Sequence, residues 1–250
     1  MITVDMGQRP FRPAGSHARD HGGGDELRPV TSISRIDARR VGVLLAAWVG
    51  LTGMLIAAGL GVVHSATVSA FDKHITSMVV GRRTNALNEV MKAITWLGSW
   101  VALVITAVVV LVLAARGRLR WFAVLLAVVA WAGEAGGVTL AKHVVGRQRP
   151  PEEIWLMKAH GWSWPSGHTA TAVLVFSVLA LVVTHVVGSR VTRVASWLTA
   201  GILIAAVGFS RLELGVHWTT DVVASLAFVS VWLLVIARLF ATELNQASRR

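Results

Sequence analysis

Hydrophobic residues along the chain gather into long runs that are separated by short polar stretches. A helix needs roughly 20 predominantly apolar residues to cross the hydrocarbon core of a bilayer, and six runs are of about this kind. They cover residues 41–63, 97–115, 121–140, 166–187, 195–209 and 218–235. The pattern therefore predicts an all-α protein, a polytopic membrane bundle of six transmembrane helices.

The segment between the first two runs has a different pattern. From Asp72 to Lys92, apolar residues recur at helical spacing, namely Ile75, Met78, Val79, Leu87, Val90 and Met91. This spacing predicts an amphipathic helix, which either lies at the membrane interface or packs over the mouth of the bundle. The sequence leaves both alternatives open.

The composition agrees with a membrane protein. Hydrophobic residues make up 54% of the chain and charged residues only 15%, whereas a soluble domain carries about 25% charged residues. The formal net charge of +11 comes mainly from segments that flank apolar runs, so we attribute it to membrane topology. No motif for nucleic acid is present, and we expect no nucleic-acid partner. The chain has no cysteine, which excludes a disulfide, a thiolate nucleophile and a cysteine metal site.

The basic segments predict the domain organisation and the topology. Residues 1–40 are expected to form a disordered basic tail, residues 41–238 the six-span domain, and residues 239–250 a second tail. Six spans place both tails on the same side as the basic loops 116–120 and 190–193. Because an excess of Lys and Arg marks the cytoplasmic side, we expect a plasma-membrane protein with both termini in the cytoplasm.

The remaining loops then belong to the outer face. They cover residues 64–96, 144–165 and 210–217. One of them disagrees with the rule, because 64–96 contains the basic residues Lys73, Arg82, Arg83 and Lys92. We keep the topology because three basic elements outnumber one.

Polar residues cluster at the outer ends of three spans, where ionisable groups are costly and mark candidate functional sites. The clusters cover residues 142–150, 165–168 and 210–221. Each has a structural explanation when taken alone. A terminal lysine or arginine can extend to the interface, Ser166 can be a helix N-cap, and His217 with Asp221 can be an i, i+4 pair.

Together, the three clusters supply what phosphoryl transfer needs. Lys142, Arg149 and Arg211 can bind phosphate oxygens, and the N-terminus of the helix that begins near Ser166 favours an anion. These positive groups stabilise the charge of the transferred phosphate. Because they already provide the charge that a metal would bring, we expect neither a metal nor another cofactor.

Two histidines and a carboxylate complete the expected chemistry. His217 can attack phosphorus as a neutral imidazole. Asp221, one helical turn later, can fix the tautomer of His217 and stabilise the charged ring. His168, at the start of another helix, can protonate the leaving oxygen.

The three clusters resemble the signature motifs of the phosphatidic acid phosphatase type 2 superfamily: Lys-x6-Arg-Pro, Pro-Ser-Gly-His and Ser-Arg-x5-His-x3-Asp. The match runs from Lys142 to Asp221 with all motifs in order and at the family spacing. The resemblance implies a six-helix membrane core and a phosphohistidine on His217, with Asp221 assisting and His168 as the acid. It implies a set of phosphate-binding residues, which are Lys142, Arg149, Ser166, Gly167 and Arg211.

We therefore expect an integral membrane lipid phosphatase that hydrolyses a phosphate monoester or diphosphate at the outer face. The candidate substrates are polyprenyl diphosphate, slightly favoured because bacterial carrier lipid is recycled there, phosphatidylglycerol phosphate and phosphatidic acid. The alternatives are a lipid phosphotransferase with the same histidine intermediate and a vanadate-binding haloperoxidase, although the latter enzymes are typically soluble. A non-enzymatic transporter or binding protein for an anionic lipid would need neither His217 nor Asp221.

For some polar and aromatic residues, the sequence leaves two interpretations open. Glu134 lies within a span beside glycines, which fits either a function or a contact between helices. Tryptophans near span ends are typical of the membrane interface; they are Trp96, Trp100, Trp121, Trp162, Trp164 and Trp218. Trp162 and Trp164 also suit a wall for a lipid tail. Substrate specificity is expected to reside in 64–96 and 151–164.

Overall fold

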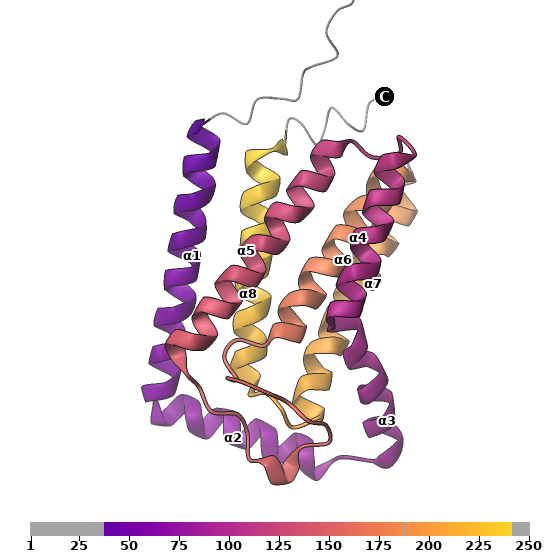
Figure 1. Cartoon of the computed structure of the whole chain (residues 1–250). Coiled ribbons are helices and arrows are strands. Elements are labelled where there is room, and N and C mark those ends of the chain that lie inside the picture. The colour runs from indigo at the N-terminus through magenta and orange to yellow at the C-terminus, as the bar shows by residue number, and fades with distance from the viewer. Residues whose placement is uncertain (1–37, 188, 242–250) are drawn as a thin grey trace, which may run out of the picture. The chain divides into compact units, whose positions relative to one another are not determined.

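The computed structural model describes residues 38–187 and 189–241. Most of the expected N-terminal tail, residues 1–37, and the chain from residue 242 onward lie outside the described residues. The described part is all-α, with eight α-helices, two short 3-10 turns and no strand (Figure 1). The elements are α1 Ala38–His64, α2 Ala66–Gly81, α3 Asn85–Ile94, η1 Thr95–Gly98, α4 Trp100–Ala115, α5 Trp121–Val145, η2 Glu152–Ile154, α6 Gly167–Val186, α7 Arg190–Glu213 and α8 Thr219–Leu239.

Five helices, α1, α5, α6, α7 and α8, are long and apolar enough to cross a membrane. A sixth span would be built from two pieces. Helix α4 has 16 residues, or about 24 Å at the usual rise, which is short of a roughly 30 Å hydrocarbon core. α3 and η1 continue it across a bend of 46° at Ser99. The all-helical membrane bundle is thus confirmed, with up to six spans.

Hydroxyl side chains begin most of the helices. The N-caps of α2, α3, α4, α6 and α7 are Ser65, Thr84, Ser99, Ser166 and Ser189, and each accepts a hydrogen bond from the first turn. A cap of this kind typically contributes about 1 kcal/mol. Helix α5 differs because its N-cap is Arg120, whose side chain makes no capping hydrogen bond.

Helix α6 lies in the middle of the bundle and packs against α4, α5, α7 and α8. Small residues allow close packing on its neighbours. A side chain at Gly133 of α5 would lie 2.5 Å from the Trp232 ring of α8, and one at Gly137 would collide with Phe228. Glycines at such positions let large aromatic side chains pack against the backbone of a neighbouring helix.

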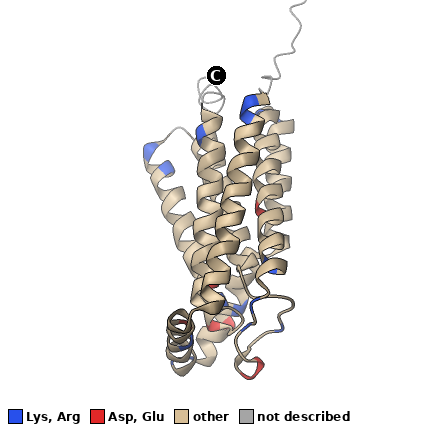
Figure 2. Ribbon diagram, turned by 90° about the vertical axis from the view of Figure 1, so that its left-hand side faces the viewer, with Lys and Arg blue, Asp and Glu red and all other residues tan. Residues whose placement is uncertain are grey.

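The bundle has two chemically different ends. We call one the basic end, where α1, α5 and α7 begin and α4, α6 and α8 finish (Figure 1). Within the described residues, this end carries arginines and no Asp or Glu (Figure 2). The arginines are Arg39, Arg40, Arg116, Arg118, Arg120, Arg190, Arg193 and Arg238. The opposite end, which we call the loop end, carries α2, α3 and the long segment 146–166.

The amphipathic segment differs from the prediction. It forms two helices, because the first ends at Gly81 and Thr84 caps a new one. Asp72 and Thr76 of α2 are buried, and α2 packs against α1, α7 and α8. Figure 1 shows α2 lying across the loop end. Of the two alternatives, packing over the mouth of the bundle therefore describes α2.

The spans also differ in their bounds. Helix α7 runs from Arg190 to Glu213 rather than from 195 to 209, so its first turn includes basic residues that we had expected in a loop. Helix α1 begins at Ala38, inside the expected tail. Cationic side chains can extend to the interface from either end of a helix, which is why hydropathy alone ended these helices too early.

Candidate active site

The first motif places Lys142 in the last turn of α5, at the loop end. Its ammonium group donates hydrogen bonds to the carbonyl oxygens of Trp162 and Pro165, at 2.7 and 2.8 Å. The helix then stops at Gly146, whose φ of 59° is left-handed and favours glycine. This turn leads into the loop that holds Arg149.

The second motif is attached to the third through the backbone. The N–H of Ser166 donates to the carbonyl of Asp221 at 3.2 Å, and the carbonyl of Ser166 accepts from the Ser225 hydroxyl at 2.9 Å. Gly167 begins α6, and a side chain at this position would project into open space. The first turn of α6 is therefore fixed against α8 while no side chain covers it at Gly167.

The third motif forms a buried histidine–aspartate pair. His217 lies in the turn before α8, and its Nδ1 is 3.2 Å from Oδ2 of Asp221 in the first turn of α8. Three further donors hold the carboxylate: Arg147, the Ser163 hydroxyl and the backbone N–H of Trp218. Four donors around one buried carboxylate fix its orientation and hence that of the imidazole.

Arg149 approaches the other nitrogen of His217. Its Nη1 lies 3.0 Å from His217 Nε2 and donates to the carbonyl of Val216 at 2.6 Å. An arginine can only donate, so Nε2 accepts and Nδ1 carries the proton that faces Asp221. The pKa of His217 is lowered to about 3, chiefly because burial disfavours the charged ring, although Asp221 acts in the opposite direction. His217 is therefore a neutral imidazole at pH 7.

Three cations surround the histidines. His168 lies half-buried in the first turn of α6. Lys142, Arg149 and Arg211 all lie close enough to interact electrostatically with its ring. The three come from α5, the following loop and α7, so the fold gathers the cations of separate segments at the loop end.

Arg211 has an unsatisfied donor. It lies in the last turn of α7 and is only 2% exposed. Its Nη1 donates to the Thr95 hydroxyl and lies 3.5 Å from the sulfur of Met157. Its Nε has no hydrogen-bond partner in the described part of the chain. A buried N–H without a partner is costly, and a phosphate oxygen is a suitable acceptor for it.

The structure thus brings all eight predicted residues to the loop end. Several of them already have other partners. The Ser166 hydroxyl is fully buried and accepts a 3.0 Å hydrogen bond from Thr169, Lys142 is bonded to carbonyls, and Arg149 donates to the carbonyls of His160, Gly161, Trp162 and Val216. The role of each residue stays a prediction, which we develop below.

The sequence analysis missed a buried charge network next to these residues. Arg147 lies 2.6 Å from both Oδ1 of Asp221 and Oδ2 of Asp72. Asp72 also accepts from the backbone N–H and the hydroxyl of Thr220. Arg147 falls at an unspecified position of the first motif, and Asp72 lies on a predicted amphipathic helix, where an acid is ordinarily solvated. No local pattern identified either residue.

Arg83, one of the basic residues that disagreed with the topology rule, has structural contacts at the loop end. Its guanidinium donates to the carbonyl oxygens of Ile154, at 2.8 Å, and Glu213. A side chain at Gly215, where φ is 72°, would collide with this same Ile154 carbonyl. Arg83 thus joins α2, the long loop and α7.

The structure distinguishes between the residues for which the sequence left two interpretations, the tryptophans and Glu134. Trp164 is 2% exposed and donates to the carbonyl of Leu55 in α1, so its assignment to the membrane interface was wrong. Trp162 is partly exposed at the loop end. Glu134 is buried two turns before Lys142 in α5, or about 12 Å along the helix, and so lies apart from the candidate site.

Comparisons with known proteins show the family to which the chain belongs. Residues 118–244 match the model of the PAP2 superfamily. Phosphatidylglycerophosphatase B of Bacillus subtilis (strain 168) is 32% identical over 161 residues, covering 64% of this chain and 78% of the relative.

Two crystal structures have similar folds. The first transmembrane PAP2 type phosphatidylglycerolphosphate phosphatase from Bacillus subtilis has a TM-score of 0.65 at 28% identity, over 78% of this chain and 95% of that one. Aquifex aeolicus LpxE has a TM-score of 0.51 at 20% identity, over 66% and 93%, a likeness of fold alone. Sequence and fold together show that this chain is a membrane-embedded member of the PAP2 superfamily.

Proposed function

We propose that this protein hydrolyses a lipid-linked phosphate through a phosphohistidine intermediate on His217. The observation that carries the proposal is the state of His217. Its Nδ1–H is directed at Asp221, and its neutral Nε2 is directed at Arg149. Nε2 is thus a nucleophile beside a cation that binds phosphate.

In the first step, Nε2 of His217 attacks phosphorus as the bond from phosphorus to the lipid oxygen breaks. Arg149 exchanges its hydrogen bond with Nε2 for one with a phosphate oxygen, and Arg211 uses its unpaired Nε in the same way. Lys142 and the uncovered first turn of α6 at Ser166 and Gly167 add positive potential. His168 gives its proton to the leaving oxygen.

In the second step, water attacks the phosphorus of the phosphohistidine. His168, now neutral, accepts a proton from this water. The bond from phosphorus to Nε2 breaks, inorganic phosphate leaves, and His217 returns to its neutral form. Asp221 stabilises the positive charge on the ring while the intermediate exists.

The relatives favour one of the candidate substrates. The sequence relative and the more similar of the two crystal structures, both from Bacillus subtilis, bear names that specify phosphatidylglycerol phosphate as the substrate. We therefore place this lipid first, ahead of phosphatidic acid and polyprenyl diphosphate. The earlier slight preference for polyprenyl diphosphate has no support among these relatives.

We infer that the site faces the outer side of the plasma membrane. The arginines of the basic end have no acids among them, whereas the Lys and Arg of the loop end occur together with Asp and Glu (Figure 2). Counted with the sequence of the two tails, which adjoin the basic end, 15 of the 24 Lys and Arg belong to that side. Basic residues are retained on the cytoplasmic side, so the loop end, which carries the candidate site, is the outer one.

A phosphate-release panel in detergent with EDTA tests the function, its substrate and its independence of metals together. The panel contains phosphatidylglycerol phosphate, phosphatidic acid and polyprenyl diphosphate, each with and without an acceptor lipid. We expect the highest kcat/KM for phosphatidylglycerol phosphate, release of inorganic phosphate in EDTA, and no transfer to the acceptor.

The matched variants are His217→Ala and His143→Ala. His143 is an exposed histidine next to Lys142 whose Nδ1 lies 2.8 Å from its own helix carbonyl at Thr139. We expect His217→Ala to lower kcat/KM by at least about 10³-fold and His143→Ala to retain activity. Wild-type activity in purified His217→Ala would refute the mechanism.

A further inference from the structure

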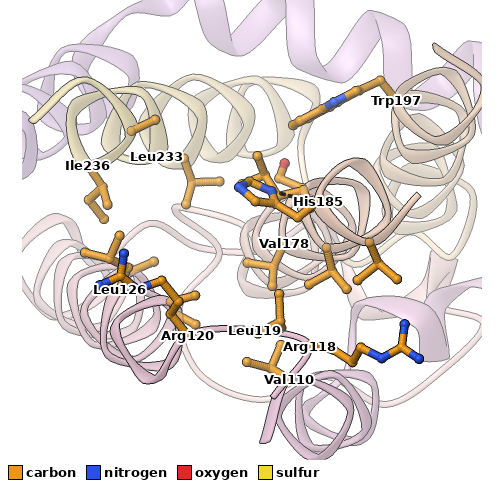
Figure 3. A pocket seen from close by; sticks show the side chains of 18 of the residues that line it. Val110, Arg118, Leu119, Arg120, Leu126, Val178, His185, Trp197, Leu233 and Ile236 are labelled. Carbon is orange, nitrogen blue, oxygen red and sulfur yellow. Dashed lines mark hydrogen bonds between the residues drawn. The ribbon is translucent and has the colours of Figure 1, made fainter. Parts of the chain in front are cut away.

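The bundle contains a cavity at the basic end. Its volume is about 1050 Å³, at the upper limit of the roughly 300–1,000 Å³ of small-molecule sites. The loop between α4 and α5 contributes Arg118 and Arg120 to its lining, while α5, α6 and α8 contribute apolar side chains such as Leu126, Val178 and Leu233. Figure 3 shows the apolar side chains around the opening, with the Arg118 and Arg120 side chains at its margin, extending to opposite sides.

This cavity is separate from the candidate active site. Helix α5 contributes Ala123 to the cavity and Lys142 to the site. The lining residue of α5 nearest to the site is Ala130, and the twelve residues from it to Lys142 correspond to about 18 Å along the helix. A molecule in the cavity therefore does not reach His217.

The charge around the cavity selects an anion. Every charged side chain at the basic end is an arginine within the described residues, and none is Asp or Glu. The start of α5 reinforces this preference. It opens with Arg120 and makes no side-chain cap, unlike the helices capped by Ser or Thr, so its positive dipole end meets no side-chain acceptor.

The walls select an apolar chain. Below the arginines, the lining is formed mainly by Leu, Val and Ala side chains, with Ser177 and Ser230 among them. A small soluble anion would leave these walls without a partner, and a neutral lipid would leave the arginines without one. Basic pockets between transmembrane helices bind anionic lipid head groups.

We propose that the cavity binds one anionic glycerophospholipid that is not the substrate. Its phosphodiester lies at the start of α5, where the Arg118 and Arg120 side chains turn toward it from opposite sides, and its acyl chain lies between α5, α6 and α8. The bound lipid joins the loop between α4 and α5 to the central helix α6. It thereby stabilises the bundle from the end opposite to the chemistry.

Native mass spectrometry of the full-length protein tests this site. The probes are phosphatidylglycerol and phosphatidylcholine with the same acyl chains, because the first is an anionic phosphodiester without a phosphate monoester. We expect wild type to retain one phosphatidylglycerol in preference to phosphatidylcholine. Arg118→Ala combined with Arg120→Ala should weaken this binding by on the order of 30-fold, since each such arginine contributes roughly a fivefold factor.

Matched variants separate the cavity from general surface charge. Arg116→Ala with Arg193→Ala removes two arginines of the same end that do not line the cavity, and it should retain the lipid. Arg118→Lys with Arg120→Lys should also retain it. Ser230→Trp places an indole ring between the apolar walls, where the acyl chain would lie, and should displace the lipid, whereas Ser230→Ala should not. His217→Ala should bind like wild type.

Three results would overturn the proposal. These are unchanged binding after removal of Arg118 and Arg120, an equal loss after removal of Arg116 and Arg193, and equal retention of phosphatidylcholine by wild type. Retention by a folded Ser230→Trp variant would also contradict it. None of these results depends on whether the protein hydrolyses lipid phosphates.

Discussion

Asp221 receives four hydrogen-bond donors although its side chain is completely buried. Only one of the four is His217. The other donors, above all Arg147, prevent the carboxylate from rotating away from the imidazole, and Asp72 holds Arg147 from the far side at 2.6 Å. The pair therefore depends on a network that begins on α2, outside the three motifs.

Arg147→Gln should impair chemistry more than binding. It leaves two buried carboxylates without their shared cation, which costs about 3–5 kcal/mol of stability. The resulting displacement of Asp221 should lower kcat by on the order of 100-fold with little change in KM. Steady-state kinetics and thermal unfolding check these effects.

Lys92→Gln is the matched control for this variant. It removes an exposed ion pair with Glu89, at 2.8 Å, and exposed pairs contribute about 0–1 kcal/mol. Its kcat and thermal stability should stay close to those of wild type. An Arg147→Gln variant that is folded and fully active would show that the network does not position Asp221.

The pH dependence should report the unusual state of His217. Protonation of the imidazole removes the nucleophile, so activity is lost as the pH falls through its pKa. Because this pKa is lowered from 6.5 to about 3, the acid limb of kcat/KM should lie below about pH 5. An acid limb centred near the ordinary histidine value, with activity fully recovered on return to neutral pH, would contradict this assignment.

Eight positions of the candidate site could be predicted from the motifs, because each motif is a short stretch of sequence with a fixed spacing between its residues. Asp72, Arg147 and Ser163 could not be predicted in the same way. Their importance comes from burial around Asp221, and burial depends on how α2 and the 146–166 loop fold over the helix ends. A single sequence contains no local sign of that packing.

Among the helices, the bent pair formed by α3–η1 and α4 brings η1 into direct contact with the candidate site. Thr95 of η1 binds Arg211. A Cβ at Gly98 would lie 2.5 Å from the backbone oxygen of His168 in α6. The bend at Ser99 therefore places η1 against the first turn of α6 and the last turn of α7.

Gly98→Ala should disturb this contact. The neighbouring atom is a backbone oxygen, which cannot move aside cheaply, so we expect a loss of about 1–3 kcal/mol of stability and a lower kcat. Gly201→Ala is the control, because a Cβ there meets no atom within 4 Å and alanine favours a helix. Thermal unfolding and phosphate release measure both variants, and equal behaviour of the two would refute the packing described for η1.

Hydropathy predicted the apolar middle of each span but not the ends. Arg190 and Arg193 mark a loop by charge alone, yet they belong to the first turn of α7. Similarly, the regular apolar spacing from 72 to 92 concealed the break at which Thr84 starts α3. Helix caps and tertiary packing decide where a helix ends, and hydropathy averaged along the sequence takes account of neither.

The two ends of the bundle differ in their charged residues. The basic end carries arginines, and the loop end carries the candidate site (Figure 2). This asymmetry gives the bundle one preferred orientation in a membrane. It also assigns different tasks to the two ends, with chemistry on a lipid phosphate at one and retention of an anionic lipid at the other.

Cysteine labelling can test the orientation in the membrane. The chain contains no cysteine, so only an introduced cysteine can react with the label. A membrane-impermeant maleimide applied to intact bacterial cells should label Glu153→Cys, at the exposed loop end, and not Arg116→Cys, at the basic end. Both should react after the cells are opened. The reverse pattern in intact cells would invert the proposed topology.

The central claim is the covalent phosphohistidine, and trapping it is the most direct test. Purified protein that is turning over radiolabelled lipid phosphate would be quenched rapidly in alkali, which preserves phosphohistidine, and the label would be mapped by mass spectrometry. We predict label on His217 in wild type and in His143→Gln, and none in His217→Gln. Product formation by wild type without protein-bound label, or label that persists in His217→Gln, would contradict the mechanism.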